Sequence, residues 1–429
     1  MVMNLRAFLF WTFDALKGGI VRKYCKDVSY YLQNDCGENV NQLKHILDWS
    51  VNNVEFYKKY KGYKSILDFP VINKSIIKGN MDKLLCPKYD KSKLFKEETS
   101  GSTGTPLVIY QDDIKRKRAR ADTIVFSDFA GYKFGTKLYY SRVWNNFNRK
   151  SSLQSKIQNI VMQDSDKLSD SELESFIQKL EKDQSEKSVL IFASTLAALF
   201  RYLETRKRKT TAIVASFITM SESLADNVRE GIQKIYKTNV VARYSDCECG
   251  ILAQQCPNHS EFHINRGSFY IELLKFDSDE KAEEGEMGRI VVTDLYNHAM
   301  PIIRYDTGDV GVISYESKCK TKGKVFTRVD GRRIDCIYST KGEMLSPYIV
   351  NNTLWRFEEL KQYQFIQNDV NDYIVKLNVK QQTFNREKEL LDALKHYIGE
   401  DANIKVEYVE EIPLLASGKR KQVINNYKK

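Results

Sequence analysis

The sequence predicts an α/β fold in which a large N-terminal region of mixed sheets and helices precedes a small α+β domain. Length is one reason, because 429 residues suffice for two or more domains with their own cores. Periodicity is the other. From about residue 94 to residue 330, short apolar runs alternate with amphipathic stretches, which is typical of strands alternating with helices.

The N-terminal segment, up to about residue 90, reads as mainly helical. Residues 39–49 place their apolar side chains near the helical period. An earlier apolar run at residues 8–13 is followed closely by Asp14 and Lys17, so it is too short to span a bilayer. We expect an amphipathic helix packed on the body of the protein, with shallow contact with a membrane surface as the alternative.

Two kinds of strand are expected in the middle of the chain. Apolar runs at residues 188–193 and 211–217 are each followed by a helical stretch, and this alternation indicates some parallel sheet. The runs at 269–274 and 288–293 indicate a stretch richer in antiparallel strands.

The C-terminal part is expected to be a separate small domain. Its boundary is placed near Gly331 and Arg332, which gives a large domain at residues 1–330 and a small one at residues 331–429. Its expected elements are a strand at 373–379, a helix at 385–397 and a strand at 404–409.

Composition limits the classes of partner. A net charge of +11 suits anionic ligands such as nucleotides, coenzyme A and sugar phosphates, or an acidic membrane surface. Nucleic-acid binding rests on this charge alone, because no zinc-finger, basic-zipper or RRM pattern accompanies it. The eight cysteines are sparse and follow no secretory signal, so we expect reduced thiols in the cytoplasm and no disulfide framework.

A run rich in glycine and hydroxyl side chains is the first candidate functional motif. Glycines let successive N–H groups point at one anion, and Ser or Thr hydroxyls add donors, so the run suits a nucleotide polyphosphate. It lacks the Gly-Lys-Ser/Thr ending of a P-loop, and a solvated turn is the alternative. Its residues are Ser100, Gly101, Ser102, Thr103, Gly104 and Thr105.

Four further motifs follow along the chain. Tyr244 precedes Glu248 by four residues, so an aromatic ring that can stack on a base stands near a carboxylate that can bind magnesium. Asp309 lies in a Gly-bounded turn, where it can accept hydrogen bonds from ribose. Arg332 lies in a basic Gly turn, and Lys419 follows Gly418 near the C-terminus. Each motif alone is also typical of an ordinary loop.

Taken together and in this order, the five motifs resemble those of the adenylate-forming superfamily of acyl-CoA synthetases, adenylation domains and luciferases. The chain is most similar to the phenylacetate–CoA ligase branch, and within it to the CapK-like proteins linked to capsule and surface polysaccharide synthesis. The resemblance extends from Phe69-Pro-Val-Ile-Asn-Lys74 to Lys419. It implies a large N-terminal adenylation domain and a small, mobile C-terminal domain that turns about a hinge at residues 331–335.

The resemblance also implies roles for individual residues. Lys419, Glu248 and Thr103 would be catalytic, and Glu248 would hold magnesium. Lys419 would reach the carboxylate and the α-phosphate, and Tyr244 would stack on adenine. Asp309 would bind the ribose with help from Arg332. The implied ATP-binding set is Ser100, Gly101, Ser102, Thr103, Gly104, Thr105, Ser221, Glu222, Ser223, Tyr244, Asp309 and Arg332.

The implied reaction is ATP- and magnesium-dependent adenylation of a small carboxylic acid, with release of pyrophosphate. The acyl group would then pass to coenzyme A, to a carrier-protein thiol, or to an amine or hydroxyl of a sugar, in cytoplasmic surface-polysaccharide synthesis. The alternatives are an arylacid-degrading ligase of the phenylacetate–CoA type and a non-catalytic nucleotide-binding scaffold.

Relatives in this branch often carry a Cys/His cluster, which implies a structural zinc site here. The candidates are Cys256, His259, His263 and Cys319. Zinc prefers four such ligands, and a degenerate site or an ordinary buried cluster is the alternative.

Two other runs have no assigned role. The basic run from Lys115 to Arg120 is expected to be a solvated helix face, with a contact to a phosphate of coenzyme A or of a phosphorylated acceptor as the alternative. Trp144 is a candidate wall of the acyl pocket, or otherwise a core residue.

Overall fold

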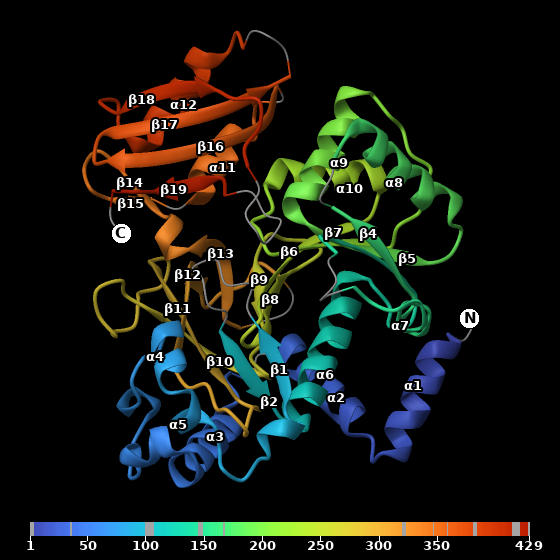
Figure 1. Ribbon diagram of the computed structural model, residues 1–429, viewed down its shortest axis with the longest axis vertical. Coiled ribbons are helices and arrows are strands. Elements are labelled where there is room, and N and C mark those ends of the chain that lie inside the picture. Colours follow the sequence, from blue (N-terminus) through green and yellow to red (C-terminus); the bar gives the residue numbers. More distant parts are fainter. Residues whose placement is uncertain are drawn as a thin grey trace.

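The computed structural model describes residues 4–34, 37–98, 107–144, 149–165, 168–319, 323–345, 347–357, 359–380, 384–413 and 421–427. These residues form an α/β fold (Figure 1). It contains an eleven-stranded sheet, a four-stranded sheet and two sheets of two strands each. The predicted fold class is confirmed.

The N-terminal segment is helical, as predicted. Its α-helices are α1 (Leu5–Leu16), α2 (Ile20–Gln33), α3 (Val40–Asn53), α4 (Lys74–Gly79) and α5 (Met81–Leu84). Asp14 fixes the corner between α1 and α2, because its carboxylate accepts hydrogen bonds from the backbone N–H groups of Val21 (3.0 Å) and Arg22 (2.9 Å). These N–H groups at the start of α2 would otherwise lack partners.

The large sheet has eleven strands and combines a parallel half with an antiparallel half. The parallel half runs β4 (Ile160–Asp164), β3 (Lys137–Arg142), β5 (Lys187–Phe192), β6 (Ser216–Met220) and β7 (Asn239–Asp246). The antiparallel half continues through β8 (Gly250–Gln255), β9 (Phe262–Ile264), β13 (Val325–Arg332), β12 (Tyr305–Ser314), β11 (Met287–Asp294) and β10 (Phe269–Leu274). Both halves were predicted from the sequence.

Helices cover both faces of the parallel half. They are α6 (Asp113–Ala130), α7 (Ser152–Gln158), α8 (Asp170–Lys182), α9 (Ala193–Thr205) and α10 (Asp226–Tyr236). Alternate side chains of a strand point to opposite faces. Phe217 therefore packs with the core formed by α8, α9 and α10, whereas Ile218 packs against Ala130 of α6.

One predicted strand begins later than expected. The apolar run at 211–217 forms a strand only from Ser216 onward. Ala212 and Val214 are buried in the same core as α9 and α10, so burial without strand pairing explains their apolar character.

A two-stranded sheet flanks the predicted phosphate loop. β1 (Phe95–Glu98) pairs with β2 (Val108–Gln111), and Glu98 lies opposite Val108. The loop at residues 99–106 lies outside the described residues.

The C-terminal part has its own sheet and core. Its elements are β14 (Ile337–Tyr338), β15 (Met344–Leu345), α11 (Pro347–Leu354), β16 (Leu360–Asp369), β17 (Asp372–Val379), α12 (Glu387–Ile398), β18 (Asn403–Tyr408) and β19 (Val423–Asn425). The four-stranded sheet has the order β18-β17-β16-β19, and it lies above the large sheet in Figure 1. β13 extends to Arg332, and a domain division at residue 331 stays a prediction.

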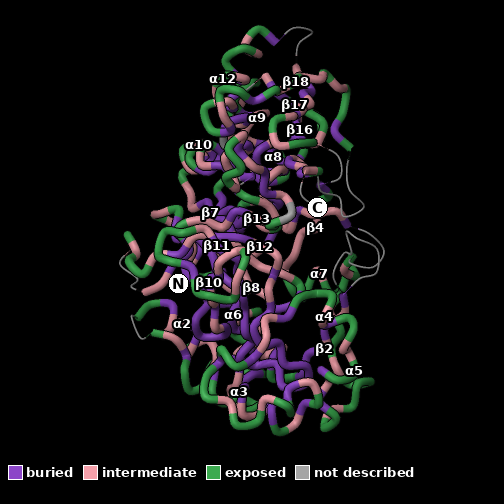
Figure 2. Tube along the Cα trace, turned by 90° about the vertical axis from the view of Figure 1, so that its left-hand side faces the viewer, coloured by how far each residue is buried: buried purple, intermediate pink, exposed green. Residues whose placement is uncertain are grey.

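Buried residues follow the strands and α6, whereas most exposed positions lie on outer helices and turns (Figure 2). Among the described helices, none combines the length and the apolar character that crossing a bilayer requires.

Candidate active site

Two of the predicted nucleotide-binding segments lie at the carboxyl ends of neighbouring parallel strands. Ser221, Glu222 and Ser223 follow β6, and Tyr244 lies near the end of β7. The two strands are paired, with Thr219 opposite Ala242. Ligands of open α/β sheets bind in the crevice outside such strand ends. The fold therefore brings these two segments, distant in sequence, to one edge.

Glu222 has a structural contact at this edge. Its carboxylate accepts a hydrogen bond of 2.8 Å from the backbone N–H of Ser194, in the first turn of α9. A carboxylate is favourable at this end of a helix, because the free N–H groups there carry partial positive charge. Ser221 precedes it with a φ of 69°, so the chain turns sharply as it leaves β6. ATP binding by residues 221–223 stays a prediction.

A tight turn between β7 and β8 buries Glu248. Asp246 holds the turn, because its Oδ1 accepts hydrogen bonds from the backbone N–H groups of Cys249 (2.7 Å) and Gly250 (3.1 Å). The Glu248 side chain is 4% exposed. Its Oε1 accepts a hydrogen bond of 2.9 Å from the Tyr305 hydroxyl of β12. A carboxylate is thus fixed in a buried position beside the predicted adenine-stacking residue.

The ammonium group of Lys74 forms an ion pair with this carboxylate. Its Nζ lies 3.0 Å from Glu248 Oε1. The backbone of Ile72, two residues earlier, exchanges hydrogen bonds with the start of β12 and the residue before it, from Ile72 N to Arg304 O (2.9 Å) and from Asp306 N to Ile72 O (2.8 Å). Sequence analysis did not assign Lys74 to the site. The signal that could have found it is the segment Phe69–Lys74, where the family resemblance begins.

Tyr244, Asp309 and Arg332 also meet here. The Tyr244 hydroxyl donates a hydrogen bond of 2.9 Å to Asp309 Oδ2. Arg332 of β13 lies directly opposite Asp309 of β12 in the strand register. Burial raises the pKa of Asp309 to about 6 despite the lowering effects of the Tyr244 hydrogen bond and of the Lys74 and Arg332 charges. Three predicted binding residues are therefore neighbours.

The acidic side chains of this site fit a divalent cation. Burial, together with the negative charge of Glu248, raises the pKa of Asp246 to about 8. Its Oδ2 is buried and has no hydrogen-bond partner among the described residues. A nearby cation stabilises the charged form of a carboxylate such as Asp246, and magnesium takes oxygen ligands of this kind. Binding of magnesium by Glu248 stays a prediction.

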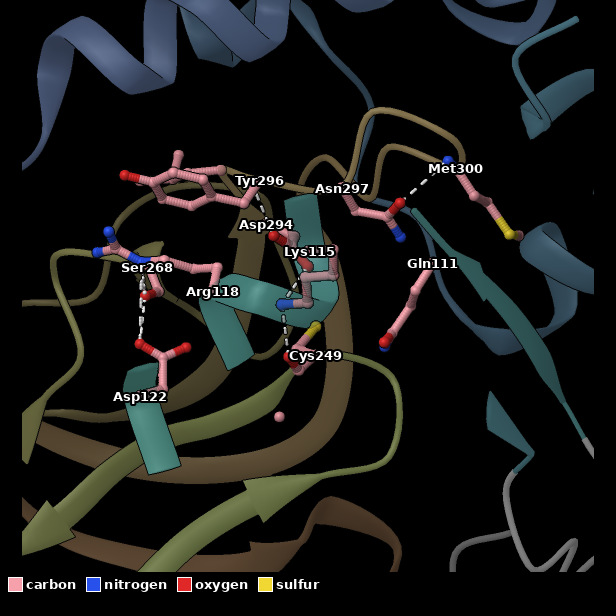
Figure 3. A network of polar contacts seen from close by, with 12 residues as sticks. Gln111, Lys115, Arg118, Asp122, Cys249, Ser268, Asp294, Tyr296, Asn297 and Met300 are labelled. Carbon is pink, nitrogen blue, oxygen red and sulfur yellow. Dashed lines mark hydrogen bonds and ion pairs between the residues drawn. The ribbon is translucent and has the colours of Figure 1, made fainter. Parts of the chain in front are cut away.

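A buried polar network supports the turn that carries Glu248 (Figure 3). Lys115 of α6 is fully buried, and its Nζ lies 2.6 Å from Asp294 Oδ2 and donates a 2.7 Å hydrogen bond to the carbonyl of Cys249. Arg118, one turn later, pairs with Asp27 at 2.6 Å and donates to Ser268 at 2.7 Å. The expectation that the basic run is a solvated face is therefore wrong for Lys115 and Arg118.

The structure does not describe the remaining predicted catalytic and phosphate-binding residues. Ser100, Gly101, Ser102, Thr103, Gly104, Thr105 and Lys419 lie outside the described residues. Just after Lys419, Lys421 forms an ion pair of 2.9 Å with Asp335, whose carboxylate also lies 3.2 Å from Arg332. The C-terminal segment thus reaches the strand end that carries Arg332.

The predicted zinc ligands are brought together in part. The ligand atoms of Cys256, His263 and Cys319 lie within 4.8 Å of one another, and the two sulfur atoms are 3.3 Å apart. Burial lowers the pKa of His263 to about 4, so its ring is neutral, as a metal ligand must be. His259 is not in this group, and its carbonyl accepts a hydrogen bond from Arg229.

Trp144 packs as a core residue. It is buried, and its indole N–H lies within hydrogen-bond distance of the carbonyls of Tyr140 (3.3 Å) and Gln163 (3.1 Å). These contacts favour the core interpretation over a pocket wall.

Comparison with known proteins shows what this chain resembles in sequence and in fold. Residues 337–426 match the family model of the CapK C-terminal domain. Protein CapK of Staphylococcus aureus is 26% identical over 96% of both chains. The structure of 2-hydroxyisobutyryl-CoA ligase in complex with 2-HIB-AMP superimposes with a TM-score of 0.69, at 14% identity, over 90% of this chain and 88% of that one. The chain is thus similar to CapK along nearly its whole length and has the fold of the adenylate-forming ligases.

Two further similarities are to a coenzyme A ligase in sequence and to an amide bond synthetase in fold. A phenylacetate–coenzyme A ligase of Thermus thermophilus is 28% identical over 34% of this chain and 33% of its own. The amide bond synthetase McbA of Marinactinospora thermotolerans shares the fold, with a TM-score of 0.53 at 13% identity, over 76% of this chain and 66% of that one.

Proposed function

We propose that the protein is a ligase that uses ATP to adenylate a small carboxylic acid and releases pyrophosphate. One observation carries the proposal. Tyr244, Glu248, Asp309 and Arg332 come from three strands and one turn, yet they meet at the ligand-binding edge of an adenylate-forming fold. The relation to a phenylacetate–coenzyme A ligase supports the same chemistry.

The described residues are suited to holding the nucleotide. Asp309 can accept hydrogen bonds from ribose hydroxyls, since the Tyr244 hydroxyl holds its carboxylate in place and Arg332 lies opposite it on the paired strand. Tyr305 fixes the Glu248 carboxylate, which would hold magnesium, and the bound ion would neutralise charge on the departing pyrophosphate.

Lys419 would orient the attacking carboxylate toward the α-phosphorus, and the loop from Ser100 to Thr105 would bind the other phosphates. Holding both reactants in line removes much of the entropic barrier.

The acyl acceptor belongs to the same proposal. The neighbouring 2-hydroxyisobutyryl-CoA ligase is known in complex with its acyl-AMP and coenzyme A, and another neighbour is an amide bond synthetase. Coenzyme A, a carrier thiol and a sugar amine or hydroxyl are therefore all acceptors of the required chemistry. With the CapK resemblance, we propose surface-polysaccharide synthesis as the setting. No disulfide joins two of the described cysteines, which supports a reducing compartment such as the cytoplasm.

Acid-dependent exchange of labelled pyrophosphate into ATP tests the proposal. A panel of small carboxylic acids should contain at least one that supports exchange, and Lys419→Ala should reduce it strongly. Lys388→Ala, on the exposed side of α12, is the matched control and should behave as wild type. Failure of every acid, or a Lys419→Ala variant as active as wild type, would argue against adenylation. Nucleotide binding without turnover would favour the scaffold alternative.

Lys74→Met is expected to weaken binding of magnesium–ATP about 10-fold or more. The flexible ammonium can turn from Glu248 to a phosphate oxygen, and charge-assisted hydrogen bonds of this kind contribute about 1.5–3 kcal/mol. Calorimetric titration with magnesium–ATP measures the change. Lys78→Met, one turn later on α4, is the control. Equal affinities of the Lys74 variant and wild type for magnesium–ATP would show that Lys74 takes no part in nucleotide binding.

We also propose that Cys256, His263 and Cys319 bind structural zinc, with a fourth ligand still to be assigned. Purified protein should then contain about one zinc per chain, and Cys256→Ser should lose the metal and unfold at a lower temperature. Cys25→Ser, which removes a thiol outside the cluster, should keep it. Elemental mass spectrometry measures the zinc content of wild type and of both variants. Wild-type protein free of zinc would leave the alternative of an ordinary buried cluster.

A further inference from the structure

Helix α1 has two apolar faces, and only one of them is packed. On the inner face, the Phe10 ring lies 4.8 Å from that of Phe134, and Trp11 lies in the same cluster as Val21 of α2. The opposite face is open to solvent. Its apolar side chains are between 47% and 78% exposed, and they are Leu5, Phe8, Leu9, Phe13 and Leu16.

The spacing of these five residues makes them one continuous stripe, which we call the α1 face. Positions three and four apart lie on the same side of a helix, and the five residues follow that rule along the whole length of α1. Scattered single apolar residues are normal on a surface, but an aligned set of this kind marks an interaction site. Figure 1 places α1 at the edge of the molecule.

Charge around the α1 face is positive. Over residues 4–33 the basic side chains are Arg6, Lys17, Arg22, Lys23 and Lys26, and the acidic ones are only Asp14 and Asp27. Both carboxylates already have partners within the protein. Asp14 accepts hydrogen bonds from the start of α2, and Asp27 pairs with the buried Arg118 at 2.6 Å. The α1 face is thus apolar, and its charged surroundings are basic.

Helix α7 lies beside the beginning of α1. The guanidinium of Arg6 donates a hydrogen bond of 3.4 Å to the carbonyl of Lys156 in α7. Two more exposed apolar side chains, Leu153 and Ile157, follow each other at helical spacing on α7. The region around α1 therefore carries more exposed apolar surface than the α1 face alone.

We propose that the α1 face docks on the surface of a bilayer that contains anionic lipids, with the helix lying in the plane of the interface. Twelve residues of helix extend about 18 Å, well short of the roughly 30 Å hydrocarbon core, so α1 lies on the bilayer and does not cross it. Phe and Leu side chains enter the interface, and Lys and Arg side chains meet the lipid headgroups. Charge complementarity favours a lipid surface over a second copy of this basic chain.

Vesicle flotation tests this proposal with the full chain. Wild-type protein should float with vesicles in which about a third of the lipid is phosphatidylglycerol, and not with phosphatidylcholine alone. Adding salt to about 0.5 M should weaken the binding, because it screens the headgroup charge. The double variant Phe8→Ser/Phe13→Ser should bind about 10-fold or more weakly, since two exposed rings no longer enter the interface.

The controls separate docking from misfolding and from self-association. Ile213→Ser changes an apolar residue outside α1 that is even more exposed than Phe8 and Phe13, and it should bind as wild type. Unchanged thermal unfolding of the double variant shows that the fold is kept. Three results would overturn the proposal: no flotation of wild type, equal flotation of the double variant, or a wild-type dimer in solution that the double variant dissociates.

Discussion

Glu248→Gln is expected to reduce acid-dependent pyrophosphate exchange about 100-fold or more while the protein stays folded. The amide keeps the shape of the side chain and can still accept the Tyr305 hydrogen bond. It lacks the negative charge that a magnesium ligand supplies, and it leaves Lys74 without its ion-pair partner. Exchange assays at saturating acid, with magnesium varied, measure the loss.

A matched control shows whether the effect belongs to the site. Glu230→Gln removes an exposed carboxylate from α10 and should retain full exchange. Circular dichroism and thermal unfolding of Glu248→Gln should match those of wild type. A Glu248→Gln variant with undiminished exchange would show that this carboxylate takes no part in adenylation.

Lys115→Met is expected to lower the free energy of unfolding by about 3–5 kcal/mol. Lys115 and Asp294 are both fully buried, so removing the ammonium leaves an uncompensated carboxylate in the interior. The carbonyl of Cys249 also loses its hydrogen bond, next to the residue that carries the site carboxylate. Denaturant unfolding followed by tryptophan fluorescence measures the change.

Two further variants isolate the cause of this destabilisation. Lys117→Met removes an ammonium from the same helix, but its ion pair with Asp113 is partly exposed, so the cost should stay below about 1 kcal/mol. Adding Asp294→Asn to Lys115→Met should recover part of the stability, because the buried charge is gone. If Lys115→Met is no more costly than Lys117→Met, the buried pair does not stabilise the fold.

Much of the site could be predicted because its residues lie in short motifs with a fixed order. Tyr244 and Glu248 are four residues apart in the sequence, and Asp309 and Arg332 are opposite each other on paired strands. The order of the motifs, together with the family resemblance, is enough to predict that these residues belong to one site. Lys74 was missed because its contact with Glu248 depends on long-range packing of residues 69–74 against β12, which local patterns do not encode.

The basic run shows a different limit. A block of Lys and Arg in sequence predicts a solvated surface, yet a helix turns some members of the block toward the core, because residues three and four apart share one side. Lys115, Arg118 and Asp122 lie three and four positions apart and face the core together, where Asp294, Asp27 and Ser268 pair with them. These partners are far away in sequence, so only the fold reveals that the charges are buried.

Transfer of oxygen from the acid to AMP tests the central proposal most directly. An acid that supports exchange is supplied with both carboxyl oxygens as ¹⁸O, together with ATP, magnesium and an acyl acceptor. If the carboxylate attacks the α-phosphorus, one labelled oxygen remains on AMP after the acyl group is transferred, and mass spectrometry finds AMP heavier by one ¹⁸O. Unlabelled AMP, or ADP with label in inorganic phosphate, would contradict adenylation.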